Sequence, residues 1–120
     1  MIKTVKDLKV YVSSFELAME IFRLSKNFPK EEKYSLIIQI VRSSRSIAIN
    51  IREGYAKRHY EQVFIRHLVD ALGSCEETKG WLDFAYECKY LDNDSYIKYI
   101  NKYDEIGAML FKLIKNWKSK

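Results

Sequence analysis

Glycine and proline are scarce in this chain, and long apolar runs are absent. Only four glycines and one proline occur among 120 residues, which favours long helices and few turns. No apolar segment approaches the about 20 residues that a membrane-spanning helix needs, and residues 1–12 contain no apolar stretch followed by a cleavage site. We therefore expect a cytoplasmic protein with no membrane partner.

Metal-binding and catalytic patterns are also missing. Cys75 and Cys88 lie about 20 Å apart on one predicted helix, so they cannot form an intrachain disulfide. Neither His59 nor His67 stands three residues after a glutamate, as the di-metal sites of helical bundles require. No nucleophile elbow, phosphate loop or HExxH motif occurs. The sequence predicts no catalytic residue, no metal site, no cofactor and no enzymatic activity.

Four helices account for the chain, at about 7–26, from 28–29 to 55–57, 59–90, and from 92–94 to 117. Thr4 or Asp7 can cap the first helix and Asp92 or Asp94 the fourth, while Pro29 suits the first turn of the second. Because the connections are short, neighbouring helices must run in opposite directions. The predicted fold is all-α, a single domain over residues 1–120 built as an antiparallel up-down-up-down four-helix bundle.

Apolar residues spaced by threes and fours give the last three helices one core stripe each. The stripes are Leu36, Ile37, Ile40, Ser44, Ile47, Ile51 and Tyr55; Tyr60, Phe64, Leu68, Ala71, Cys75, Thr78, Leu82 and Ala85; and Tyr96, Ile100, Tyr103, Gly107, Leu110, Ile114 and Trp117. Gly73 and Gly80 lie one heptad apart on the far side of the third helix. Two interpretations stay open: they let another backbone or a large ring come close, or they mark a kink.

The first helix carries two apolar stripes where a surface helix needs one. One stripe is Leu8, Val12, Phe15, Met19 and Phe22; the other, nearly opposite, is Val10, Leu17, Ile21 and Leu24. A central helix in an irregular bundle would explain both stripes, but no helix is central in a four-helix bundle. We therefore predict a homo-oligomer whose interface includes the second stripe, together with Ile38 and Ile49 from the far face of the second helix.

Positive and negative charge are separated along the chain. Residues 23–67 carry ten lysines or arginines and four acids, residues 68–111 carry four and nine, and residues 112–120 add four lysines. Separated charge favours a surface that faces a partner. The basic residues of the middle segment, which could contact successive phosphates of a nucleic acid, are Arg42, Arg45, Arg52, Lys57, Arg58 and Arg66.

Two plainer interpretations of these basic residues stay open. The arginines could pair with acids inside the chain or between subunits, and Glu53, Asp70, Glu76 and Glu77 are the candidates. Lys57 and Arg58, at a corner between two helices, could simply be solvated charge. Asn50, Glu53, Ser74 and Glu77 are expected to orient the second and third helices against each other.

Six segments of the chain form a pattern that is specific when they are taken together. They are Phe28-Pro29-Lys30-Glu31-Glu32-Lys33-Tyr34, Gln39-Ile40-x-Arg42, Ser46-Ile47, Asn50-Ile51-x-Glu53-Gly54-Tyr55, Phe64-Ile65-Arg66 and Ala71-Leu72-Gly73-Ser74-x-x-Glu77. This pattern resembles the four-helix-bundle family encoded within intervening sequences of bacterial large-subunit (23S) ribosomal RNA genes. The chain departs from the family at Ala48, where the family usually has proline, and at Arg52, where it usually has alanine. The resemblance covers nearly the whole chain.

The resemblance implies a cyclic homopentamer of antiparallel bundles. It also implies kinship with the basic accessory proteins of diversity-generating retroelements, which bind nucleic acid and a reverse transcriptase. Our leading hypothesis is a non-enzymatic oligomeric protein that binds RNA or DNA backbone through its arginine-bearing surface. The alternative is a protein-interaction scaffold, for example for a reverse transcriptase, with the arginines used in subunit contacts.

Overall fold

The structure, a computed structural model, describes residues 2–117 and is built from helices. The four long helices are α1 (Lys9–Ser25), α2 (Ile38–Ala56), α3 (Glu61–Glu87) and α4 (Asn93–Asn116). A 3₁₀ turn, η1 (Val5–Asp7), precedes α1, and a 3₁₀ turn, η2 (Lys30–Glu32), and a π-helical turn, η3 (Lys33–Ile37), precede α2. No strand occurs in this part of the chain, so the prediction of an all-α fold with four helices is confirmed.

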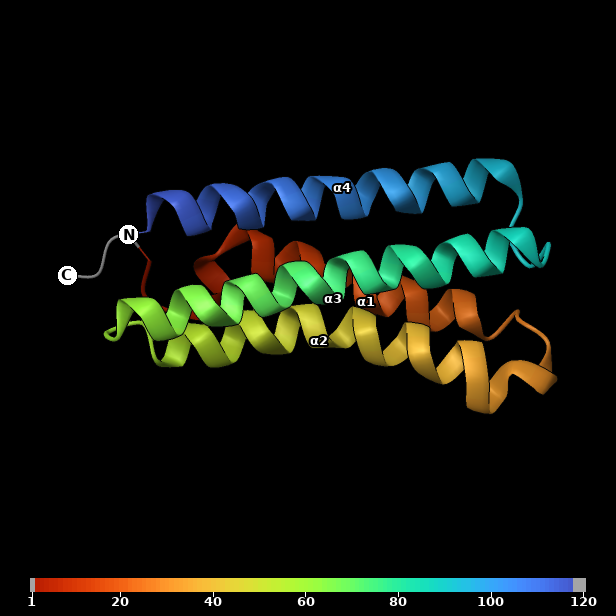
Figure 1. Ribbon diagram of the computed structural model, residues 1–120, viewed down its shortest axis with the longest axis horizontal. Helices are drawn as coiled ribbons and strands as arrows, with labels where there is room; N and C mark the ends of the chain where they lie inside the picture. Colours follow the sequence, from red (N-terminus) through yellow and green to blue (C-terminus); the bar gives the residue numbers. More distant parts are fainter. Residues whose placement is uncertain (1, 118–120) are drawn as a thin grey trace.

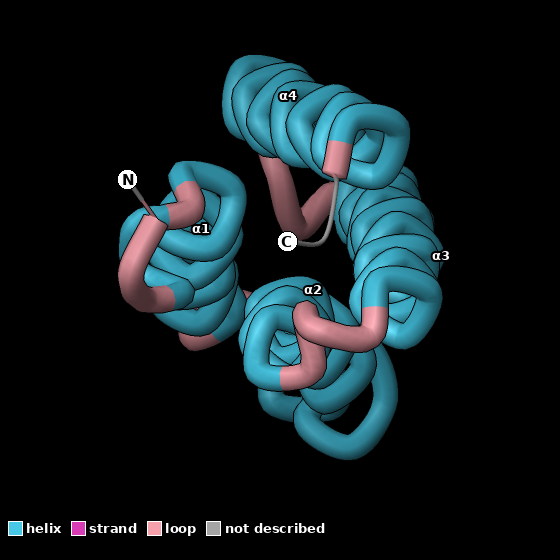
Figure 2. The backbone as a smooth tube through the Cα atoms, turned by 90° about the vertical axis from the view of Figure 1, so that its left-hand side faces the viewer, coloured by secondary structure: helices cyan, strands magenta, loops and turns pink. Residues whose placement is uncertain are grey.

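The chain reverses direction at each connection between long helices (Figure 1). The α1–α2 and α3–α4 connections lie at one end of the molecule, and the α2–α3 connection lies at the other, near both termini (Figure 1). Viewed along its length, the molecule places α1, α2, α3 and α4 in that order around a common centre (Figure 2). Its principal extents are 48 × 25 × 20 Å.

Side chains cap η1 and α4 at positions that the sequence predicts, whereas α1 itself begins after Leu8 without a side-chain cap. Thr4 and Asp7 form a reciprocal capping box around η1, in which the Asp7 carboxylate accepts from the Thr4 backbone N–H at 2.9 Å. The Asp92 carboxylate accepts from the Ser95 N–H at 2.7 Å at the start of α4. That hydrogen bond holds the pKa of Asp92 below its ordinary value. Thr4 and Asp92 are thus the N-caps of the first and last helical segments.

The second helix begins as a distorted segment, whereas the sequence predicted one uninterrupted helix. Glu32 ends η2 and caps η3, where its Oε1 atom accepts from the Leu36 N–H at 3.4 Å. Its other oxygen accepts from the Tyr90 hydroxyl at 2.8 Å, which raises the pKa of Tyr90 to about 12. Tyr90 also packs against the Phe28 ring at a centroid distance of 5.7 Å. Residues 28–37 are therefore held by Tyr90, which follows α3, and they do not continue the regular helix of α2.

The predicted core stripes of α2 and α3 are buried almost throughout. In α3 every stripe residue from Phe64 to Ala85 is buried. Tyr60 is exposed because it is the N-cap of α3 and has a non-helical backbone, so the heptad does not extend to it. In α4 the buried face is rotated slightly from the prediction and consists of Tyr99, Tyr103, Ile106 and Leu110.

The stripe of α1 that was predicted to form a subunit interface packs inside the single chain, while the other stripe is divided between buried Leu8 and exposed Phe15. Val10, Leu17 and Ile21 are buried in the core of the single chain, so the prediction that they form a subunit interface is wrong. Leu24 is half-buried against the same core. Phe15, which was predicted to face the core, is 51% exposed.

Two buried serines explain this difference from the prediction. Ser14 and Ser25 lie on the face that carries Leu17. Their hydroxyls donate to the carbonyl oxygens of Tyr11 and Phe22, at 3.0 and 2.7 Å. Because each hydroxyl is satisfied within its own helix, it can be buried at little cost. A pattern of apolar residues alone does not reveal that this partly polar face is the core face.

Polar pairs fix the register of α2 against α3. The Thr78 hydroxyl donates to Ser43 Oγ at 2.9 Å, Ser46 and Ser74 hydroxyls lie 2.9 Å apart, and Asn50 Oδ1 lies 3.2 Å from His67 Nδ1. As the residue number rises along α2, it falls along α3. Asn50 and Ser74 thus orient the two helices as predicted. Glu77 instead accepts from Trp81 on its own helix, at 3.0 Å, and Glu53 is exposed.

The two thiols should differ sharply in reactivity. Cys75 is buried, and its thiol donates to the Tyr103 carbonyl oxygen at 3.3 Å, whereas Cys88 is exposed. Burial raises the pKa of Cys75 to about 11, so almost none of it is thiolate near pH 8. At that pH we expect Cys88 to react with a maleimide rapidly and Cys75 only after urea denaturation, as followed by intact mass. Rapid double labelling of the folded protein would contradict the buried position of Cys75.

Candidate functional site

The outer face of α2 carries the mixture of arginines and isoleucines that the sequence predicted. Arg42, Arg45 and Arg52 are all exposed, and Ile38 and Ile49 among them are 40% and 51% exposed. Over about 21 Å of helix, therefore, large apolar side chains alternate with guanidinium groups. Neither a purely solvated face nor a core face has this composition.

A large groove runs beside this face, and we call it the basic groove. It has a volume of about 1070 Å³ and lies between the end of α1, the distorted segment that includes η3, and α2. Its apolar lining includes Phe22, Phe28, Ile37, Ile38, Val41 and Ile49, and its charged lining is Lys26, Lys30, Lys33, Arg42 and Arg45. No acidic side chain lines it. The groove therefore suits an occupant that combines apolar surface with negative charge.

Two of the three arginines of α2, Arg45 and Arg52, contact aromatic rings instead of acids. The Arg45 guanidinium lies 5.1 Å from the centroid of the Phe22 ring. The Arg52 guanidinium lies 5.8 Å from that of Tyr11 and donates to the Tyr11 hydroxyl at 3.0 Å. The rings thereby position the two guanidinium groups along the α1 side of α2.

Pairing of these arginines with acids of the same chain does not occur among residues 2–117. The ion pairs there involve Lys79 with Glu76 and Asp104, at 3.1 and 2.7 Å, and Lys102 with Glu20, at 3.2 Å. None of them contains Arg42, Arg45, Arg52 or Arg66. An anion that neutralises those four arginines must therefore come from outside the part of the chain that the structure describes.

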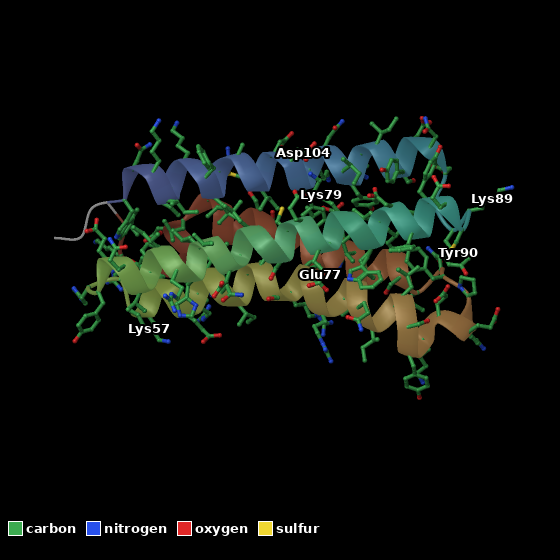
Figure 3. All side chains as sticks on the ribbon, viewed as in Figure 1. Lys57, Glu77, Lys79, Lys89, Tyr90 and Asp104 are labelled. Carbon is green, nitrogen blue, oxygen red and sulfur yellow. The ribbon has the colours of Figure 1, made fainter. Side chains whose placement is uncertain are left out.

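A second group of cations surrounds the α2–α3 connection, and we call it the basic end. Lys57 Nζ lies 3.4 Å from His67 Nε2, and the Arg58 guanidinium lies 4.1 Å from the centroid of the Tyr55 ring. Arg66 is exposed on the first turns of α3. Lys57 marks this end in Figure 3, opposite Lys89. The last turn of α4, with Lys115, reaches the same end, while Lys118 and Lys120 lie outside the described residues.

The outer face of α3 is a surface that the sequence interpretation only partly recognised. Its exposed residues, which we call the acidic ridge, are Val69, Asp70, Gly73, Glu76, Glu77, Asp83, Phe84 and Glu87, with half-buried Gly80. Phe84 is 60% exposed. A Cβ atom built on Gly73 or Gly80 meets nothing within 4 Å, and α3 continues through both. The two glycines therefore serve no close approach within the chain and no break in the helix.

We also searched residues 2–117 for a metal site and for a membrane-spanning helix. Across residues 2–117, no group of three or more histidine, cysteine, aspartate or glutamate side chains could hold a metal ion. Nor does this part of the chain contain a helix that is long and apolar enough to span a membrane.

Comparison with known proteins relates the chain to one protein family and to several solved structures, one of which is described here. The family model described as 23S rRNA-intervening sequence protein matches residues 6–112. A crystal structure from Bacteroides thetaiotaomicron VPI-5482, described as a protein with unknown function from the S23 ribosomal protein family, is 34% identical and superimposes with a TM-score of 0.77. That match covers 89% of this chain and 96% of the other. Among curated proteins, none matches.

Proposed function

We propose a function from one premise: the chain belongs to the 23S rRNA-intervening sequence protein family. In this proposal the protein acts by binding and not by catalysis. Antiparallel four-helix bundles assemble into a cyclic homo-oligomer, and the assembly holds the backbone of RNA or DNA on its basic surface. The observation that carries the proposal is the exposure of Arg52 and Arg66, which form no ion pair within residues 2–117 and lie on the two helices that meet at Lys57 and Arg58.

The basic end suits phosphate groups best. Lys57, Arg58 and Arg66 belong to adjoining segments at one end of the molecule, and Arg52 lies about one turn before the end of α2. Lysine and arginine bind phosphate by charge, and such contacts carry no sequence information. We therefore assign the phosphate contacts to these four side chains and expect little preference among base sequences.

Salt dependence tests this assignment. Four neutralised phosphates should weaken binding of a structured RNA by about 100-fold between about 50 and about 200 mM salt, because counterions are released on binding. Lys57→Glu with Arg66→Glu should weaken binding at least about tenfold in a mobility-shift titration at low salt. The matched control is Lys89→Glu with Lys98→Glu, which reverses two exposed lysines near the other end of the molecule.

The control separates a localised site from a general effect of net charge. Equal losses in the two double variants, or binding that does not respond to salt, would contradict a nucleic-acid site at the basic end. The two double variants change the net charge equally, so their difference isolates position.

A protein-interaction scaffold is the second candidate function, and the basic groove favours it. A nucleic-acid backbone offers no apolar surface to match Ile38, Val41 and Ile49, whereas a protein does. In this role Arg42 and Arg45 would be used in subunit contacts, and the assembly would present its surfaces to a protein partner, for example a reverse transcriptase. If Arg42→Glu with Arg45→Glu dissociates the assembly and leaves RNA binding to subunits intact, these two arginines belong to the scaffold function.

A further inference from the structure

We propose that the basic groove of one chain receives the acidic ridge of a second copy. The inference rests on the self-assembly proposed above and does not depend on nucleic-acid binding. Each surface carries exposed apolar side chains among charged ones, and these are not covered within the single chain. Ile38 and Ile49 are exposed beside the groove, and Val69 and Phe84 are exposed on the ridge.

Charge selects this pairing over the other possible contacts between copies. Five lysines or arginines and no acid line the groove. The ridge carries Asp70, Glu76, Glu77, Asp83 and Glu87. The nearest lysine, Lys79, turns toward α4 and pairs with Asp104 (Figure 3). Groove against groove, or ridge against ridge, would bring like charges together, and only groove against ridge places opposite charges in contact.

The acids that face the groove keep free oxygen atoms. Glu76 uses Oε2 for Lys79, and Glu77 uses Oε2 for Trp81 Nε1, both on their own helix. The Oε1 atoms of both remain available to a guanidinium of a second copy. Arg42 and Arg45 have unused donors of the kind that bind carboxylates bidentately.

The internal register of α2 and α3 predicts which residues meet. The pairs Ser43–Thr78 and Ser46–Ser74 place Arg42 and Arg45 at the height of residues 75–78 of α3. A rotation about an axis parallel to the helices, which relates the copies of a ring, leaves these heights unchanged. Arg42 and Arg45 of one copy therefore stand level with Glu76 and Glu77 of the next.

The same register matches the apolar side chains. Ile49 of one copy stands level with the ridge between Val69 and Gly73 of the next, and Ile38 stands level with the ridge between Gly80 and Phe84. Because the glycines lack side chains and have open space around them, the ridge is low where the isoleucines approach. Exposed α2 from Ile38 to Arg52 and exposed α3 from Val69 to Phe84 are also alike in length, about 21 and about 22 Å.

The contact uses two different surfaces, so each copy offers a groove to one neighbour and a ridge to another. Such a heterologous interface closes into a ring when the rotation between copies closes. The two surfaces lie on neighbouring helices, α2 and α3 (Figure 2), so one copy can contact two neighbours at the same time.

Charge reversal tests the interface by light scattering and sedimentation. The wild-type chain should assemble, while Arg42→Glu with Arg45→Glu, or Glu76→Arg with Glu77→Arg, should raise the dissociation constant of assembly on the order of 100-fold. Combining all four changes should restore assembly, because opposite charges face each other again. Circular dichroism of each double variant should match that of the wild type, which shows that both are folded. Lys89→Glu with Lys98→Glu should assemble like the wild type.

The possible failures are distinguishable. A wild-type chain that stays monomeric on the order of 100 μM overturns both the interface and the proposed self-assembly, and leaves the groove to another occupant. A wild-type assembly that survives either double variant overturns this interface alone. Failure of the four-change variant to reassemble also overturns the pairing. RNA binding through Lys57 and Arg66 is measured separately and is unaffected by these outcomes.

Discussion

Replacing Ile21 by alanine should lower the free energy of unfolding by about 2–5 kcal/mol. Ile21 is fully buried in the core of the single chain, where removal of three carbon atoms loses apolar burial and leaves a cavity. For a chain of this size the loss corresponds to a drop of roughly 10 °C in the midpoint of thermal unfolding. Urea denaturation followed by circular dichroism, at one fixed protein concentration, measures the change without interference from assembly.

Phe15→Ala is the matched control on the same helix. Phe15 is 51% exposed, so its truncation should cost clearly less than that of Ile21 in the same urea titration. The assembly of Ile21→Ala at native temperature should match the wild type in size. If Ile21→Ala instead released stable monomers, Ile21 would lie between copies, and its burial within one chain would be contradicted.

The α1 comparison shows what apolar periodicity does and does not determine. The spacing of Val10, Leu17 and Ile21 correctly marks a helical stripe, but so does the spacing of Phe15 and Phe22 on the opposite side. The choice between the stripes depends on serines whose hydroxyls bind their own backbone, and on the faces that the other three helices present. The existence and length of a helix follow from its own sequence. The face that is buried by a helix with two apolar stripes depends instead on the rest of the fold.

The basic surface was predictable from the sequence because it lies on one regular helix. Angular spacing on α2 places Arg42, Arg45 and Arg52 opposite the buried stripe, and all three are exposed there. The groove beside them was not predictable, since it depends on the π-helical turn η3 and on its anchor, the hydrogen bond from Tyr90 to Glu32 at 2.8 Å. Those residues are 58 positions apart in the chain, so no local pattern connects them.

The acidic ridge shows an intermediate case. Its acids and its two glycines were all visible in the sequence, and Gly73 and Gly80 were recognised as a pair on the far side of the third helix. The sequence could not show that the space around the two glycines is open, because that depends on where every other helix lies. The open space on the acidic ridge and the positive charge of the basic groove together suggest that the two surfaces meet. Sequence patterns describe each surface separately and do not relate them.

Replacing Gly54 by alanine should destabilise the protein by about 2 kcal/mol and displace the basic end. A Cβ atom on Gly54 would lie 2.6 Å from His67 Cβ and 2.9 Å from Phe64 Cδ1, both on α3. Phe64 cannot move aside, because it is fully buried with its ring edge-on to Tyr55 and Trp117, at centroid distances of 6.4 and 4.7 Å. The two helices must separate, and this overpacking outweighs the better helix propensity of alanine.

The displacement links stability to the proposed function, because His67 lies within 3.4 Å of Lys57 Nζ. Gly54→Ala should therefore weaken RNA binding as well as lower the urea midpoint. Gly107→Ala is the matched control, since a Cβ atom there meets nothing within 4 Å, and it should raise stability by up to about 1 kcal/mol through helix propensity alone. Equal effects of the two substitutions would mean that α2 and α3 do not approach closely at Gly54. If Gly107→Ala stabilises the protein and Gly54→Ala destabilises it, a close contact between α2 and α3 lies at Gly54, next to the basic end.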